Sequence, residues 1–246
     1  MPLPVYDNAS SVTFNGLASA TIPAFAVAGE NRLIFVGAGT QGGGFTVSSV
    51  VRNGAETFTA VPSFTRDSTG GNHLRVSGYT FVAPAVGTYS IVVTFSNALL
   101  GHTGAVSVTG AHQTVPLGTA VSATSSADDL PTLTCSAADD ELLLDQLIAW
   151  AATATAGAGQ TERYKRNAVD ITSGGCSEQP GTVAGDVMSW TLTSGSQEWS
   201  MAAVPIKPAA GGITVTQTSV ISAAASVLTH AAATLYPGSV IPTITL

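Results

Sequence analysis

The chain has 246 residues, a net charge of −7 and only 9% charged residues, against about 25% in an ordinary globular domain. Phosphate binding needs clustered lysine and arginine, so this balance argues against nucleic acid as a partner. No apolar run approaches the roughly 20 residues that span a bilayer, and residues 1–4 lack the start of a signal peptide. We therefore expect a soluble protein made in the cytoplasm, with no membrane partner.

The dominant pattern is a series of short β-rich runs separated by Gly, Pro, Asn and Asp turns. The most specific local signal is Asn53-Gly54 between two such runs, because both positions of a tight hairpin turn favour positive φ. Residues 118–129 are rich in Ser, Thr and Ala and are predicted to form a long connection. The predicted strands are 11–14, 20–27, 32–36, 47–52, 56–61, 74–82, 88–95, 104–109, 132–136, 141–150, 161–166, 187–193 and 199–207.

These strands predict an all-β fold, an antiparallel jelly-roll-like β-sandwich of two packed sheets. Residues 132–136 and 141–150 are expected to pair across the acidic turn Asp139-Asp140. Helix is considered only for residues 220–235, because of their alanines, and their Ser, Thr and Val weigh against it.

The composition changes after Lys207, since residues 208–246 contain no Asp, Glu, Lys or Arg. We therefore divide the chain into a β-sandwich domain, residues 1–208, and an uncharged extended C-terminal arm, residues 209–246, with Gly211-Gly212 as the hinge. An uncharged, β-prone arm left free in water is an aggregation hazard, so we expect it to pair with another surface. The alternative is a final strand pair of the same domain. The expected interface residues are Ile213, Val215, Val220, Ile221, Val227, Leu228, Leu235, Tyr236, Ile241 and Leu246.

Catalytic patterns are weak, and we assign no catalytic, cofactor-binding or metal-binding residue. The nucleophile elbow G-x-S-x-G is absent. Glu141 and Asp145 would share a strand face, but roughly 13 Å of backbone separates them, more than the carboxyl spacing of a glycosidase pair. Asp128-Asp129 and residues 139–141 could present oxygen ligands to calcium, although the EF-hand pattern is missing and carboxylates in turns are usually just solvated.

Four other features have an ordinary structural interpretation. Residues 37–42 spell G-x-G-x-x-G, but no helix follows to bind a phosphate, so a flexible glycine loop is expected. The basic residues 163, 165 and 166 are expected at a solvated turn. Cys135 and Cys176 could pair, and two buried free thiols are the preferred alternative. The three tryptophans, Trp150, Trp190 and Trp199, are expected to fill the core rather than to stack on sugars.

Five sequence motifs occur together over about residues 10–208: Asn31–Val36, Val51–Gly54 followed by Phe58-Thr59, Pro84–Tyr89 with Ile91, Gly157–Arg163 and Trp199–Pro208. Together they resemble a β-sandwich module of tailed-bacteriophage virion proteins and bacterial surface proteins. The resemblance implies a jelly-roll or lectin-like building block of decoration proteins, fibres and adhesins, and it carries over no catalytic residue.

We therefore expect a phage virion structural protein rather than an enzyme, a capsid decoration or cement protein assembled in the host cytoplasm. The expected partners are further copies of the chain, for example in a trimer, and other virion proteins such as the major capsid protein. The alternatives are a head or tail fibre or receptor-binding component, or a carbohydrate-binding adhesin that contacts a surface glycan. A glycoside hydrolase ranks behind these.

Overall fold

The computed structural model describes residues 3–42, 44–167, 172–182, 185–193 and 195–210. Within these ranges the chain forms strands and no helix, which confirms the antiparallel all-β sandwich class. The strands are β1 (Val5–Val27), β2 (Leu33–Gln41), β3 (Val47–Arg52), β4 (Glu56–Thr57), β5 (Thr59–Ala60), β6 (Arg66–Asp67), β7 (Leu74–Val82), β8 (Gly87–Thr109), β9 (Val121–Asp128), β10 (Thr132–Cys135), β11 (Leu142–Trp150), β12 (Ala154–Ala156), β13 (Thr161–Arg166), β14 (Thr172–Pro180), β15 (Asp186–Leu192) and β16 (Gln197–Ile206).

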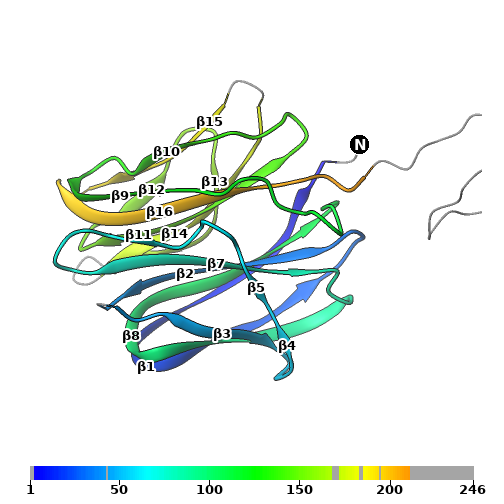
Figure 1. Cartoon of the computed structure of the whole chain (residues 1–246), viewed down its shortest axis with the longest axis horizontal. Coiled ribbons are helices and arrows are strands. Elements are labelled where there is room, and N and C mark those ends of the chain that lie inside the picture. The colour runs from blue at the N-terminus through cyan, green and yellow to red at the C-terminus, as the bar shows by residue number, and fades with distance from the viewer. Residues whose placement is uncertain (1–2, 43, 168–171, 183–184, 194, 211–246) are drawn as a thin grey trace, which may run out of the picture. The chain divides into compact units, whose positions relative to one another are not determined.

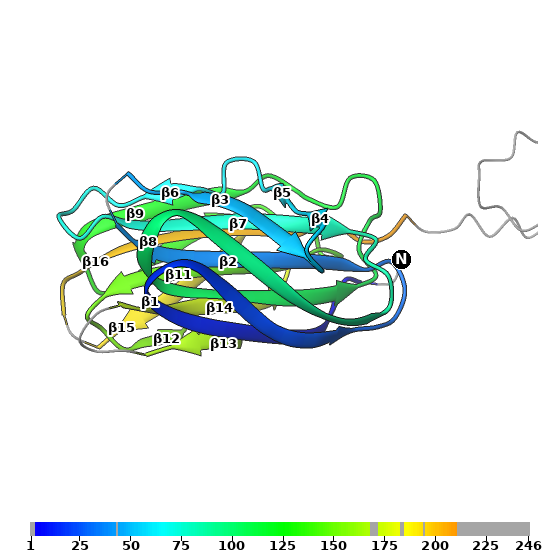
Figure 2. The same ribbon diagram turned by 90° about the horizontal axis from the view of Figure 1, so that it is seen from below.

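These strands make three sheets rather than the two expected. An eight-stranded sheet has the order β4-β3-β8-β2-β7-β5, with β1 beside β8 and β6 beside β7. A five-stranded sheet has the order β13-β14-β11-β16-β9, and a three-stranded sheet has the order β10-β15-β12. The eight-stranded sheet is bent, because β1 and β8 pair along most of their length and shift register around Phe14 and Leu17. The stack in Figures 1 and 2 therefore has four β-layers.

Three buried clusters fill the spaces between these layers. The bent sheet encloses the first, which includes Ile34, Val36 and Ile91. The middle cluster joins the eight-stranded and five-stranded sheets, and the third joins the five-stranded and three-stranded sheets. The apolar run of β11 fits this position, since Leu144 faces the middle cluster and Leu143 faces the third. A strand covered on both faces is expected to be continuously apolar rather than alternating.

The two halves of the stack have the same connectivity. The first half pairs β1 with β8 in two parts, β2 with β7 and β8, β3 with β8, and β5 with β7. The second half repeats this scheme as β9 with β16 and β10 with β15, β11 with β14 and β16, β12 with β15, and β13 with β14. We call residues 5–109 repeat 1 and residues 121–206 repeat 2. The body is thus one sandwich repeated twice in tandem, with the two inner sheets packed face to face.

The pairing registers identify equivalent residues in the two repeats. Leu33 lies opposite Val108 in repeat 1, and Leu142 lies opposite Ile206 in repeat 2, so these pairs correspond. The long β8 of repeat 1 corresponds to two separate strands in repeat 2, β15 and β16. Likewise β1 corresponds to β9 and β10.

Several sequence-based strand assignments need correction. Residues 118–129 are not a long connection, because 121–128 form β9, the edge strand beside β16. The expected hairpin of residues 132–136 and 141–150 is also wrong, since β10 pairs with β15 while β11 pairs with β14 and β16. The run β11 is buried on both faces and takes the central position of its sheet, between β14 and β16. The Asn53-Gly54 hairpin is confirmed, with φ of 50° and 76° at the two turn positions.

Candidate functional site

The interface residues predicted from the sequence all belong to the C-terminal segment and lie outside the described residues. This applies to Ile213, Val215, Val220, Ile221, Val227, Leu228, Leu235, Tyr236, Ile241 and Leu246. The helix considered over residues 220–235 lies outside them as well. What the structure does describe is the end of the body from which this segment continues.

The end of the body is tied to the linker between the repeats, residues 110–120. Ala209 N–H donates to the carbonyl of Gly110 at 2.6 Å, and Pro208 forms a β-bridge with Ala111. Lys207 N–H donates to the carbonyl of Pro116 at 2.7 Å. The last residues of the body therefore run along the linker, and the linker passes directly from the chain exit to a groove in the surface.

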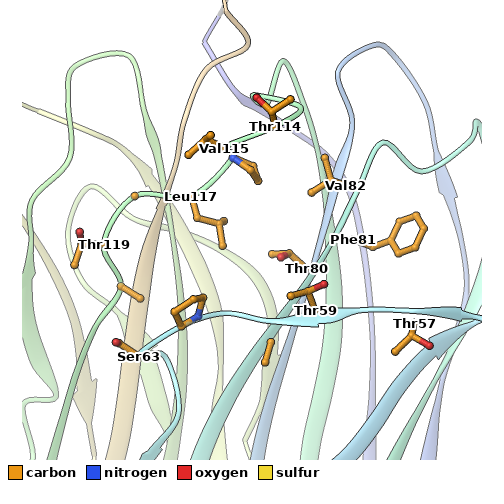
Figure 3. A pocket seen from close by; sticks show the side chains of 15 residues that line it. Thr57, Thr59, Ser63, Thr80, Phe81, Val82, Thr114, Val115, Leu117 and Thr119 are labelled. Carbon is orange, nitrogen blue, oxygen red and sulfur yellow. The ribbon is translucent and has the colours of Figure 1, made fainter.

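This groove, which we call groove 1, has a volume of about 680 Å³ (Figure 3). One wall is the segment that contains β5, the floor includes the end of β7, and the other wall is the linker. None of its lining residues is charged. They are Thr57, Thr59, Ala60, Pro62, Ser63, Thr80, Phe81, Val82, Thr114, Val115, Pro116, Leu117, Gly118, Thr119 and Ala120.

The chemistry of groove 1 suits binding rather than proton transfer. Its lining has hydroxyl, proline and aliphatic groups, the phenyl ring of Phe81, and no side chain that titrates near neutral pH. Val115 is 56% exposed, so apolar surface is available to a partner. The volume falls within the range of roughly 300–1,000 Å³ that is typical of ligand sites. A neutral, partly apolar partner with groups that hydrogen-bond to hydroxyls would fit.

A second, smaller groove occupies the corresponding place on repeat 2. We call it groove 2. It has a volume of about 340 Å³ and is lined by Leu3, Pro4, Val5, Tyr6, Glu141, Leu142, Arg163, Glu178 and Pro180. The guanidinium of Arg163 stacks on the ring of Tyr6, 3.7 Å from its centroid, and forms an ion pair with Glu178.

The carboxylates considered for glycosidase chemistry do not form a catalytic pair. Asp145 is fully buried in the core of repeat 2, where its carboxyl accepts hydrogen bonds from Ser177 N–H at 2.6 Å and from Trp190 Nε1–H at 2.7 Å. Glu141 lies before β11 and accepts from the backbone N–H of Ala138 at 3.0 Å. A carboxyl enclosed by the core cannot meet a glycan without unfolding its surroundings.

Burial has a large effect on the acid–base properties of Asp145. The loss of hydration raises its pKa to about 7, although the donors of Ser177 and Trp190 act in the opposite direction. Asp145 replaces Val36, the equivalent residue of repeat 1, as the registers of β2 and β11 show. This buried polar group is thus a difference between the two otherwise similar cores.

A second buried polar cluster lies where the two repeats meet. Tyr164 donates from its hydroxyl to Gln146 Oε1 at 2.6 Å, and Gln146 Nε2 lies 2.7 Å from His102 Nε2. Burial and, to a smaller extent, the charge of Arg166 lower the pKa of His102 to about 3. The His102 ring is therefore neutral at physiological pH.

The glycines that were expected to form a flexible loop make room for this cluster. Gly37 and Gly39 belong to β2 and not to a loop, which corrects the prediction for residues 37–42. A Cβ at Gly37 would overlap Gln146 Oε1, and one at Gly104 would overlap the ring of Tyr164. Small residues in repeat 1 therefore admit large polar side chains from repeat 2, a close-approach role typical of strand glycines.

The remaining predictions have clear outcomes. Cys135 and Cys176 are both buried and free, as preferred. Trp190 and Trp199 are buried in the core of repeat 2, as expected, and Trp150 is partly buried against the middle cluster. The basic residues 163, 165 and 166 lie on β13 rather than on a turn, and β13 matches the strand predicted for residues 161–166. Arg163 forms an ion pair with Glu178, and Lys165 forms one with Glu162.

Among the described residues, no group of three or more His, Cys, Asp or Glu side chains could hold a metal ion. The part of the chain that the structure describes also contains no helix long and apolar enough to cross a membrane. Comparison with protein-family models, with curated proteins and with solved structures finds no match for this chain.

Sequence reasoning missed groove 1 and the internal repeat that creates it. Groove 1 combines residues 57–63, 80–82 and 114–120, which are far apart in the chain and carry no motif. A possible signal is the linker itself, since Pro116 and the run that follows break the β pattern between two groups of strands.

Proposed function

We propose that this protein is a structural component of a virion, a capsid decoration or cement protein that binds and stabilises the shell. The observation that carries the proposal is the junction at residue 210, where a double sandwich is followed by a sequence without any charged residue. Such a sequence gains free energy by leaving water, and pairing with another subunit is the most direct way to do so.

The mechanism would be adhesive. The double sandwich supplies a stable block, because its inner sheets bury apolar residues on both faces. The C-terminal segment would add strands or apolar contacts to neighbouring subunits, where main-chain hydrogen bonds give affinity and side-chain pockets give specificity. The partners would be further copies of this chain and the major capsid protein, and the location would be the virion.

A fibre component or a carbohydrate-binding adhesin is the second candidate, and one observation bears on it directly. Sugar-binding sandwiches present exposed aromatic rings, whereas Trp190 and Trp199 are 1% and 3% exposed in the described body. Trp150, which is partly buried, is the remaining tryptophan for such a platform. The burial of these two rings weighs against a carbohydrate-binding adhesin and favours a capsid decoration protein.

The proposal can be tested by binding to shells. Purified protein is mixed with phage shells that lack it, and the bound fraction is measured by co-sedimentation. The full chain should bind in a saturable manner, while a chain that ends at residue 211 should lose binding and keep its β-sheet circular dichroism. Undiminished shell binding by the shortened, folded chain would overturn the proposal.

A further inference from the structure

Grooves 1 and 2 occupy equivalent places on the two repeats. Thr80 lies opposite Thr59 in repeat 1, and Glu178 lies opposite Thr161 in repeat 2, so both grooves lie at the same strand pair. Each groove is closed by the segment that leads into the first strand of the other repeat. For groove 1 this segment is the linker before β9, and for groove 2 it is the N-terminal segment at the start of β1.

The two grooves differ in what occupies them. In groove 2, the protein's own side chains take up the space, because Arg163 lies on Tyr6 and pairs with Glu178. In groove 1, the position of Glu178 is taken by Thr80, and the lining has neither an arginine nor an acidic partner. Groove 1, at about 680 Å³, is about twice as large as groove 2, at about 340 Å³. Repeat 2 therefore serves as an internal reference, because side chains of the same chain occupy the equivalent groove there.

We infer that groove 1 is the docking site for the uncharged C-terminal segment of a second copy of this chain, entered by the stretch Ile213–Thr216. The inference rests on the proposed assembly function and names the partner for it. A C-terminal segment exchanged in both directions would give a closed dimer with two identical contacts, the usual arrangement for a self-complementary surface.

The chemistry of the two surfaces matches. A charged partner would lose hydration in groove 1 without gaining an opposite charge, so a neutral partner is favoured. The sequence Ile-Thr-Val-Thr at positions 213–216 alternates aliphatic and hydroxyl side chains. The groove offers the same two kinds of group, with Val115 and Leu117 on the linker wall and Thr57 and Thr59 on the other (Figure 3).

The location of the chain exit also supports this inference. Residues 207–209 are hydrogen-bonded to the linker that forms one wall of groove 1. The linker then runs antiparallel to the end of β16, with Gly118 N–H donating to the carbonyl of Pro205 at 2.8 Å and Leu117 in a bridge with Ile206. Two copies that approach through their linkers would place each exit beside the groove of the other copy. The segment of 35 residues from Gly212 to Leu246 is long enough, at about 3.3 Å per extended residue, to cover such a contact.

The test uses full-length variants in sedimentation velocity. Ala60→Arg puts a charge on the exposed wall of groove 1, Val215→Asp puts one on the segment, and Ser90→Arg is a matched control on an exposed residue of β8 that does not line the groove. We expect the wild type and Ser90→Arg to dimerise alike, and Ala60→Arg and Val215→Asp each to weaken dimerisation at least tenfold. Thr59 is also exposed, so the Thr59→Arg variant replaces Ala60→Arg if the melting temperature of Ala60→Arg is below that of the wild type.

Mixing the two variants tests whether the segment of one copy binds the groove of the other. Ala60→Arg keeps an intact segment and Val215→Asp keeps an intact groove, so an equimolar mixture should recover heterodimers through one good contact. If Val215→Asp dissociates the protein and Ala60→Arg does not, the groove inference is wrong and the proposed function stands. A wild type that is monomeric at all concentrations tested would overturn the second copy as the occupant, while shell binding would still decide the proposed function.

Discussion

The stability of the protein should depend on pH through two buried groups whose effects oppose each other. Asp145 has a pKa raised to about 7 in the fold, so between pH 3.8 and 7 the native state holds a proton that the unfolded chain has lost. Its contribution to stability is therefore full at low pH and decreases as pH rises. His102 has a pKa lowered to about 3, so between pH 3 and 6.5 the unfolded chain holds the extra proton. Its contribution is full at high pH and is lost as pH falls.

The magnitude follows from linkage. One proton of difference between the two states changes the free energy of unfolding by about 1.4 kcal/mol per pH unit. From pH 4.5 to 6 each group thus contributes about 2 kcal/mol, with opposite signs, and the two contributions nearly cancel in the wild type. Relative to the wild type, Asp145→Asn should make stability rise by about 2 kcal/mol over this range, and His102→Gln should make it fall by a similar amount.

The assay is urea unfolding at pH 4.5, 5.0, 5.5 and 6.0, followed by tryptophan fluorescence and circular dichroism. The double variant Asp145→Asn/His102→Gln is the internal control, because removing both groups should return the slope to that of the wild type. The reasoning is refuted if both single variants keep the wild-type slope, or if both change it in the same direction. A uniform loss of stability at every pH leaves the wild-type slope unchanged and therefore counts as a refutation.

Two further predictions concern the cores. Gly37→Ala should lower the free energy of unfolding by about 1–3 kcal/mol, because the added methyl overlaps the buried side-chain amide of Gln146 across the repeat junction. The control Gly71→Ala adds a methyl in open space and should change the free energy of unfolding by less than about 0.5 kcal/mol. Urea titration checks both. Burial raises the pKa of Cys135 to about 12 and that of Cys176 well above its usual range, so neither thiol should react with a disulfide reagent in the native protein at pH 8. Both should react at once in denaturant, and fast labelling of the native protein would contradict this burial.

The sequence predicted much of the fold because local physics decides it. The hairpin at Asn53-Gly54 follows from turn chemistry, and the strand Leu74–Val82 follows from length, β-prone residues and the proline that comes soon after it. The strands that were missed lack such signals. β14 contains two glycines and few β-branched residues, and it is a strand because its neighbours β11 and β13 supply ladder partners and cover it. Tertiary context of this kind overrides local propensity.

The internal repeat could not be recognised from the sequence for a related reason. Equivalent positions share burial rather than identity, as the pairs Val36 and Asp145, or Gly37 and Gln146, illustrate. The spacing is not constant either, because repeat 1 has a longer excursion between β3 and β7 than repeat 2 has between β12 and β14. Groove 1 depends on the packing of both repeats, so it became visible only once the pairing was known.

Hydrogen–deuterium exchange measured along the full-length chain tests the central claim most directly. If the uncharged C-terminal sequence is buried in an interface, peptides from residues 212–246 should exchange far more slowly than an unstructured peptide, and residues 114–120 should be protected together with them. The Val215→Asp variant should lose both protections. Exchange of residues 212–246 at the unstructured rate in the assembled wild type would contradict the account.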